Sequence, residues 1–369
     1  MNHIDDTHLR RRLSALMTAP RCSFCTTRTA RGEPVAVDLS LLVGHVLGAV
    51  REKYRGADLP GQGISTAHAV EDVCRGAVEH RVTRAVGDRA KPALWQLRKA
   101  PAQGASDAVH AMWTSFRRQV DHERRFTLFA GPDRHGNPSL VPMLEAVSAV
   151  VDRLGLVRTL PAGHQVWRGR MRENDTAPGY RAAGIGSTPP ARATANRMSP
   201  VGVSMFYGSA DVATVLAEIS AHDPRPYAAV AAFELIRPLS VVDLAAVPAV
   251  PSLFDPDRRS LTGPIEFVRS FSEDLSRPVV RDGHGHLAYV PTQVLTEYFR
   301  CLSPLTVDGI TFRSAHNGGT NYVLFTGPQG CADPGAETPQ AMLRLRPGSE
   351  RVVARRNAGS GRPLGGGQR

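Results

Sequence analysis

The stretch NRMSPVGVSMFYGSADVATVLAEIS, residues 196–220, holds the clearest change of pattern in the chain. A turn-forming Asn-Arg-Met-Ser-Pro run leads into apolar and aromatic residues that end at Tyr207, which predicts a strand. Ser209 or Asp211 can cap a helix that follows directly. Two turns into that helix, Glu218 lies on the same face as Asp211. A strand joined at once to a helix predicts a mixed α+β unit around these residues.

The same mixture of strand and helix patterns extends on both sides of this stretch. Short β-type runs occur at 165–167, 203–207, 228–235, 239–244, 309–313 and 321–326. Helical patterns lie between them at 211–221, 264–275 and 290–302. Residues 173–196 are rich in Gly, Pro and Ala, and we interpret this long segment as a binding loop or lid. Residues 158–345 are therefore predicted to form an α+β domain.

The first 157 residues have the periodicity of helices instead. Apolar residues recur at three- and four-residue steps in four segments, 42–54, 65–86, 108–125 and 143–154. Strand signals are scarce here, so we predict a small helical domain over 1–157. At the other end, residues 346–369 consist largely of Gly, Arg and Ser, which predicts a disordered basic tail.

The chain has 369 residues and a formal net charge of +11, most of it at the two ends. Met1–Glu33 carries +3 and Arg344–Arg369 carries +6, which leaves +2 for the 310 residues between them. A nearly neutral body with basic ends favours solvated tails over a nucleic-acid surface. No run approaches the roughly 20 apolar residues that span a bilayer, and the five cysteines lack disulfide-framework spacing. We expect a cytoplasmic protein with reduced thiols, no membrane association and no nucleic-acid partner.

Four ordered motifs carry a family resemblance. They are WRGR at 167–170, the run of 196–220 with its Arg, Tyr and Glu, AYVPTQVLTE at 288–297 and DGITFRS at 308–314. In this order they resemble the RES family, named for an Arg, a Glu and a Ser, over about residues 158–330. The resemblance implies a mixed α/β fold similar to that of ADP-ribosyltransferase toxins. It also implies an enzyme that degrades NAD+ by phosphorolysis or hydrolysis of the nicotinamide–ribose bond.

Carried over by motif, the resemblance places the catalytic site at Arg168, Arg197, Tyr207, Glu218 and Ser314. Arginine grips phosphate oxygens in bidentate fashion, as a pyrophosphate requires. A carboxylate such as Glu218 stabilises an oxocarbenium-like transition state. Tyr207 can stack on nicotinamide, and Ser314 can hydrogen-bond the amide, the ribose or an incoming phosphate. No metal and no cofactor are expected, because NAD+ and, in phosphorolysis, inorganic phosphate are substrates.

The resemblance also implies a bacterial toxin or defence effector, with an antitoxin or other inhibitory protein as a candidate partner. Two alternatives to NAD+ degradation stay open. The same site would serve ADP-ribosyl transfer to a macromolecule, and a nucleotide-binding sensor without catalysis would also fit, its basic ends contacting nucleic acid. Asn321 and Gln293 are weaker site candidates that we expect to be structural.

The N-terminal half carries a resemblance of its own. The run from Arg21 to Cys25, RCSFC, followed by helices, resembles the HEPN-type domain found fused to RES domains. Cys22 and Cys25 supply half of a zinc site, which Cys74 with His68 or His80 could complete. Loop thiols without a metal are the simpler interpretation, so no metal site is predicted.

Overall fold

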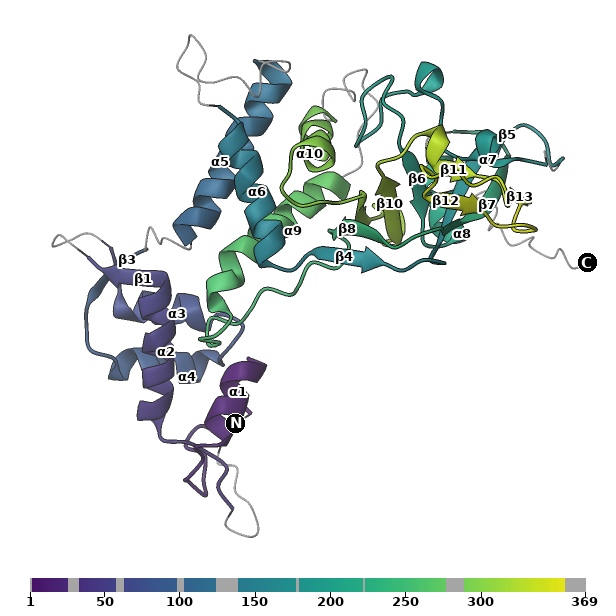
Figure 1. The fold of residues 1–369 in the computed structure, drawn as a ribbon. Coiled ribbons are helices and arrows are strands. Elements are labelled where there is room, and N and C mark those ends of the chain that lie inside the picture. Colours follow the sequence, from purple (N-terminus) through teal and green to yellow (C-terminus); the bar gives the residue numbers. More distant parts are fainter. Residues whose placement is uncertain are drawn as a thin grey trace, which may run out of the picture. The chain divides into compact units, whose positions relative to one another are not determined.

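A computed structural model describes residues 2–25, 33–57, 63–97, 103–123, 139–176, 179–221, 223–276 and 289–355, apart from the side chains of 103–112 (Figure 1). The chain divides into two compact units. The first comprises Met1–Met112 and Pro248–Phe267, and the second comprises Trp113–Val247 and Val268–Arg369.

Within its described residues the first unit contains four complete helices and a small antiparallel sheet, together with the beginnings of α5 (Gln103–His122) and α9 (Thr262–Ser276). The helices are α1 (Thr7–Ser14), α2 (Leu39–Lys53), α3 (Thr66–Cys74) and α4 (His80–Arg89). The sheet has the order β1-β3-β2, from β1 (Tyr54–Gly56), β2 (Ile64–Ser65) and β3 (Leu94–Leu97). Its core combines apolar side chains of all four helices with Phe254 from the returning segment.

Two sequence-based expectations for this unit are corrected. The helix predicted over 65–86 is in fact two helices, because Gly76 adopts a φ of +73° and the chain turns between α3 and α4. The predicted start of this helix at Ser65 is confirmed, since the Ser65 side chain caps α3 by accepting a hydrogen bond from the His68 amide. The three strands escaped prediction because they have only two to four residues each and no alternating pattern.

The second unit centres on a ten-stranded sheet with the order β11-β12-β7-β5-β6-β10-β9-β8-β4, and β13 pairs with β7 as well. Its strands are β4 (Val157–Leu160), β5 (Gln165–Arg172), β6 (Phe206–Ser209), β7 (Tyr227–Leu235), β8 (Leu239–Asp243), β9 (Gly309–Arg313), β10 (Thr320–Leu324), β11 (Cys331–Ala332), β12 (Leu343–Leu345) and β13 (Arg351–Ala354). All pairs are antiparallel except β8–β9 and β11–β12. The α+β prediction is confirmed.

Helices accompany this sheet. They are α6 (Val141–Arg153), α7 (Ala182–Ile185), α8 (Val212–Ser220) and α10 (Val290–Cys301), together with parts of α5 (Gln103–His122) and α9 (Thr262–Ser276). The boundary predicted at residue 157 differs from the observed division. Trp113 stacks on Phe116 and meets Phe271 edge-on, which ties the end of α5 to the second unit.

Two predicted irregular segments contain regular structure. The loop expected over 173–196 includes α7 and a 3₁₀ turn at Pro190–Arg192. The tail predicted from 346 onward begins with described residues that include β13, which pairs with the part of β7 that β12 leaves uncovered. The rest of that tail, 356–369, lies outside the described residues.

Helix α8 packs unusually close to strand β5. Asp211 caps the helix by accepting a hydrogen bond from the Thr214 amide at 2.7 Å. A Cβ on Gly169 would lie 2.6 Å from Val215 Cγ1 and 2.9 Å from Ile219 Cδ1, so glycine permits this approach. Among the described helices, none is long and apolar enough to cross a membrane.

We expect Gly169→Ala to lower the free energy of unfolding by about 1–3 kcal/mol, because the added methyl group overpacks the contact between β5 and α8. Gly44→Ala is the matched control. Gly44 is exposed within α2 and has no atom within 4 Å of the added carbon, so helix propensity should raise stability by about 0.5–1 kcal/mol. Urea titrations of both variants test the difference, and equal effects would contradict the close packing.

Candidate functional site

The site opens where two neighbouring strands part. Strand β5 pairs with β7 over its whole length, from Gln165 to Arg172, but it pairs with β6 only at Trp167 and Ser209. Beyond that pair the two strands diverge, and a cavity of about 430 Å³ lies among β5, β6, α8 and the segment 188–205. Its charged lining residues, within the described part of the chain, are Arg168, Arg170, Arg192 and Glu218.

Arg168 spans the gap between the strands. Its Nε donates to the carbonyl oxygens of Ile185 and Gly186 at 2.8 and 2.9 Å, and its Nη1 donates to the Tyr207 carbonyl on β6. The residue is 9% exposed, and burial lowers the pKa of its guanidinium to about 10, so it remains charged at neutral pH. The guanidinium also lies over the ring of Phe206, 5.2 Å from its centroid.

Arg170 and Arg192 add positive charge at the same cavity. Arg170 follows Arg168 on the same face of β5, and its Nη2 donates to the Gly186 carbonyl at 3.1 Å. Its Nε has no hydrogen-bond partner among the described residues. Burial lowers the pKa of Arg170, and the nearby Arg192 charge lowers it further. Arg192 itself is exposed at the cavity rim.

Glu218 reaches the cavity from α8 and is held by a chain of hydrogen bonds. Asn321 Nδ2 donates to Glu218 Oε1 at 2.7 Å, and Ser209 Oγ donates to Asn321 Oδ1 at 2.7 Å. Ser209 and Asn321 face each other in the register of β6 and β10, and both are buried. The second carboxylate oxygen, Oε2, lies 4.0 Å from His316 Nε2. One side of the carboxylate is thereby fixed, while the group remains about 31% exposed.

Tyr207 lines the cavity on the opposite strand. Its hydroxyl lies 2.8 Å from Ser199 Oγ, and burial raises the pKa of the phenol to about 12. Ser199 belongs to a tight turn closed by backbone hydrogen bonds with Asn196. Gln293 on α10 donates to the carbonyls of both turn residues, at 2.8 and 3.2 Å, which is the structural role expected for it.

Arg197 sits within that turn but does not belong to the described lining of the cavity. Its carbonyl accepts from Thr292 Oγ1, its Nη1 donates to the Asp274 carbonyl at 3.2 Å, and its guanidinium lies 5.8 Å from the Tyr289 ring centroid. Burial lowers the pKa of Arg197, while Tyr289 and Glu218 act in the opposite direction. Arg197 therefore interacts with Glu218 electrostatically, from outside the cavity wall.

Residues 165–344 match the family model described as the RES domain. This segment is similar to a RES domain and is called the RES domain below. The match covers just under half of the chain, and its ends fall at β5 and β12. The RES family is linked to NAD-related toxin activity, so the match supports an enzyme that acts on NAD. Searches of curated proteins and of solved structures found no match to the chain.

Within the RES domain, the five predicted site residues fall into two groups. Arg168, Tyr207 and Glu218 line the cavity, and Arg197 and Ser314 are not among the described residues that do. Ser314 is 4% exposed, and its Oγ accepts from the His316 amide at 3.2 Å. It therefore shapes the turn that carries His316 toward Glu218.

The residues that sequence reasoning missed are Arg170, Arg192, Ser209 and His316, and it underrated Asn321. The signal for Arg170 was present, because residues two apart on a strand share a face and Arg168 was already chosen. Asn321 was expected to be structural, since its contact with Glu218 comes from the strand register that places it beside Ser209. Arg192 lies in the segment treated only as a long loop.

We expect Arg168→Met to destabilise the RES domain by on the order of 3 kcal/mol, because the carbonyls of Ile185 and Tyr207 would lose this donor and the Gly186 carbonyl would keep only the one from Arg170. Arg192→Gln should change stability by less than about 0.5 kcal/mol, since the side chain is exposed. Thermal and urea unfolding compare the two variants. An Arg168→Met protein as stable as wild type would show that the guanidinium does not hold the parted strands.

Proposed function

We propose that the RES domain binds NAD+ in the cavity between β5 and β6 and cleaves its nicotinamide–ribose bond. The observation that carries this proposal is the pairing of one fixed carboxylate, Glu218, with arginines in a single cavity of about 430 Å³. Pockets of this size hold small-molecule ligands. NAD+ combines two phosphates with a cleavable glycosidic bond. The arginines suit the phosphates, and the carboxylate suits the bond that is cleaved.

The phosphates are assigned to Arg170 and Arg192. Arg168 uses its Nε and Nη1 for backbone carbonyls, so it serves mainly as a structural cation that adds to the field of the cavity. Arg170 keeps an Nε donor without a protein partner, and Arg192 is exposed at the rim. Planar guanidinium groups bind phosphate oxygens in pairs and remain charged at every physiological pH.

The bond cleavage is assigned to Glu218. Positive charge moves from the nicotinamide ring onto the ribose as the bond breaks, and a carboxylate close to the ribose stabilises that state. The hydrogen bond from Asn321 fixes the carboxylate before the substrate arrives, which avoids reorganisation during the reaction. Tyr207 is a neutral phenol held by Ser199 and offers a ring against which nicotinamide can stack.

Inorganic phosphate or water then attacks the ribose carbon. Phosphorolysis gives nicotinamide and the 1″-phosphate of ADP-ribose, and hydrolysis gives nicotinamide and ADP-ribose. Arg197 and Ser314 act as positioning residues in this scheme. Arg197 anchors the turn whose Ser199 holds Tyr207. Ser314 orients the turn that carries His316.

In a bacterial cell such an enzyme would act as a toxin or defence effector by depleting NAD+. Its partner would then be an antitoxin or another inhibitory protein. We also propose that the first unit is a HEPN-type domain, a hypothesis supported by its four helices and the RCSFC run.

We expect Glu218→Gln to lower kcat for NAD+ by about 100-fold or more with little change in KM, because the charge acts in the transition state. The control is Glu297→Gln, an exposed carboxylate on α10 outside the cavity lining, which should retain wild-type turnover. Assays with and without inorganic phosphate, followed by product analysis, separate phosphorolysis from hydrolysis.

Full turnover by Glu218→Gln would contradict its assignment. Transfer of labelled ADP-ribose to macromolecules of a lysate would favour ADP-ribosyl transfer over NAD+ degradation. Binding of NAD+ without any turnover would favour a sensor.

We further expect Arg192→Gln to raise KM for NAD+ about 10-fold at nearly constant kcat, because a phosphate contact is present before and during the reaction. Arg300→Gln, an exposed arginine on α10 outside the lining, is the matched control and should leave KM unchanged. Steady-state kinetics over a range of NAD+ concentrations measure both. Equal KM values for wild type and Arg192→Gln would remove Arg192 from the phosphate site.

A further inference from the structure

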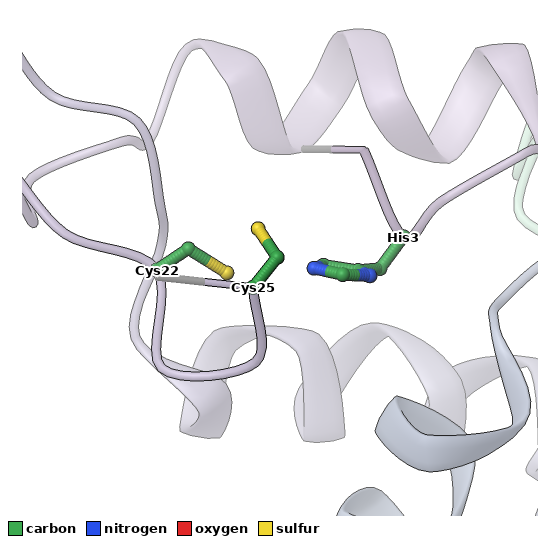
Figure 2. Close-up of side chains that lie close together, drawn as sticks. All are labelled: His3, Cys22 and Cys25. Atoms are coloured by element: carbon green, nitrogen blue, oxygen red, sulfur yellow. The ribbon is translucent and has the colours of Figure 1, made fainter. Parts of the chain in front are cut away.

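The first unit contains a cluster of three metal-ligating side chains far from the RES motifs in sequence. The donor atoms of His3, Cys22 and Cys25 all lie within 4.8 Å of one another. His3 and Cys22 are buried, and Cys25 is partly buried. Figure 2 shows both sulfur atoms on the side of the histidine ring that carries one of its nitrogens.

The imidazole of His3 is oriented as a metal-binding histidine would be. Its Nδ1 is hydrogen-bonded to Glu79 Oε2, and its side chain also interacts with the thiols of Cys25 and Cys22. The residue is 9% exposed. A carboxylate on one ring nitrogen fixes the ring and raises the basicity of the other nitrogen, which is the usual outer partner of a zinc-bound histidine.

Backbone contacts hold His3 in place beside Glu79. Ile4 forms an antiparallel bridge with Val78, and the Glu79 amide donates to the His3 carbonyl at 2.9 Å. These bonds fix His3 beside Glu79, the residue that orients its ring. Cys22 and Cys25 lie at the two ends of a turn, and their two-residue separation is the spacing of paired zinc-binding cysteines.

We propose that His3, Cys22 and Cys25 bind one Zn²⁺ ion. Thiolate and imidazole donors suit this ion, and binding releases the two thiol protons. Tetrahedral zinc has Zn–S distances of about 2.3 Å and Zn–N distances of about 2.0 Å, so the donors need to close by only about 1 Å. A cavity of about 350 Å³ lined by His3 and Cys22 adjoins the cluster, and it gives water or a small anion access to the fourth position.

The ligands that the sequence suggested as completing the site have other roles. Cys74 is buried in the helical core, and burial raises the pKa of its thiol to about 11. His68 Nδ1 lies 2.9 Å from Ser65 Oγ at the start of α3. His80 is hydrogen-bonded to Arg84 within α4. The third donor that the structure places beside the cysteines, His3, stands 19 positions before Cys22 in the sequence.

The test is the metal content of the full chain, purified under reducing conditions without chelators and then incubated with Zn²⁺ and desalted. We expect about one zinc per chain in the wild type and its loss in Cys22→Ser and Cys25→Ser. Cys301→Ser, an exposed cysteine of the second unit, is the matched control and should keep the metal. Glu79→Gln should weaken zinc affinity about 10-fold by loosening the His3 ring.

A titration of the wild type with Co²⁺ makes the test independent of whether the variants fold. Thiolate-to-cobalt charge-transfer absorption that saturates at one equivalent would support the site. Absence of that absorption, absence of bound zinc, or retention of zinc in both serine variants would overturn it. A Cys22–Cys25 disulfide that persists in the presence of reductant would overturn it as well.

Discussion

The arrangement of the second unit around its cavity depends on the Arg168 guanidinium, whose hydrogen bonds take the place of backbone pairing between β5 and β6. Past the pair of Trp167 and Ser209 the strands β5 and β6 separate, so the Tyr207 carbonyl on β6 needs a donor other than the backbone of β5. Arg168 supplies donors to that carbonyl and to the carbonyls of Ile185, the last residue of α7, and Gly186. Lysine could not reproduce this, because a single ammonium lacks the planar arrangement of separate donors.

The parting of the strands also explains how opposite charges come to share one cavity. Side chains alternate across a strand, so Arg168 and Arg170 face α7, whereas Gly169 between them faces α8. Glu218 comes from α8 and thus from the other face of β5. In a continuous sheet the two groups would be separated by the strands. Here they line the same cavity because the sheet is split at this point.

Much of the second unit could be predicted, because its elements have local signals. The helix after Asp211 begins at a true cap, and the strands at 228–235 and 309–313 are buried apolar runs. The strands β4, β11 and β13 could not be predicted, since they are short and depend on partners distant in the chain. In the first unit, the turn at Gly76 interrupts an apolar pattern that reads as one continuous helix.

Site prediction shows the same division between local and distant information. Motifs supplied Arg168, Tyr207 and Glu218, which do line one cavity. The motifs could not show that Arg168 donates to backbone carbonyls while Arg170 keeps an Nε without a partner among the described residues. This difference depends on where the pairing of β5 with β6 ends. The proposed zinc site is a similar case. The cysteine pair is visible in the sequence, but His3 lies beside it only in the folded chain. Residue type thus indicates which chemistry a site can support. Strand pairing and hydrogen bonding determine which side chain has free donors or acceptors for that chemistry.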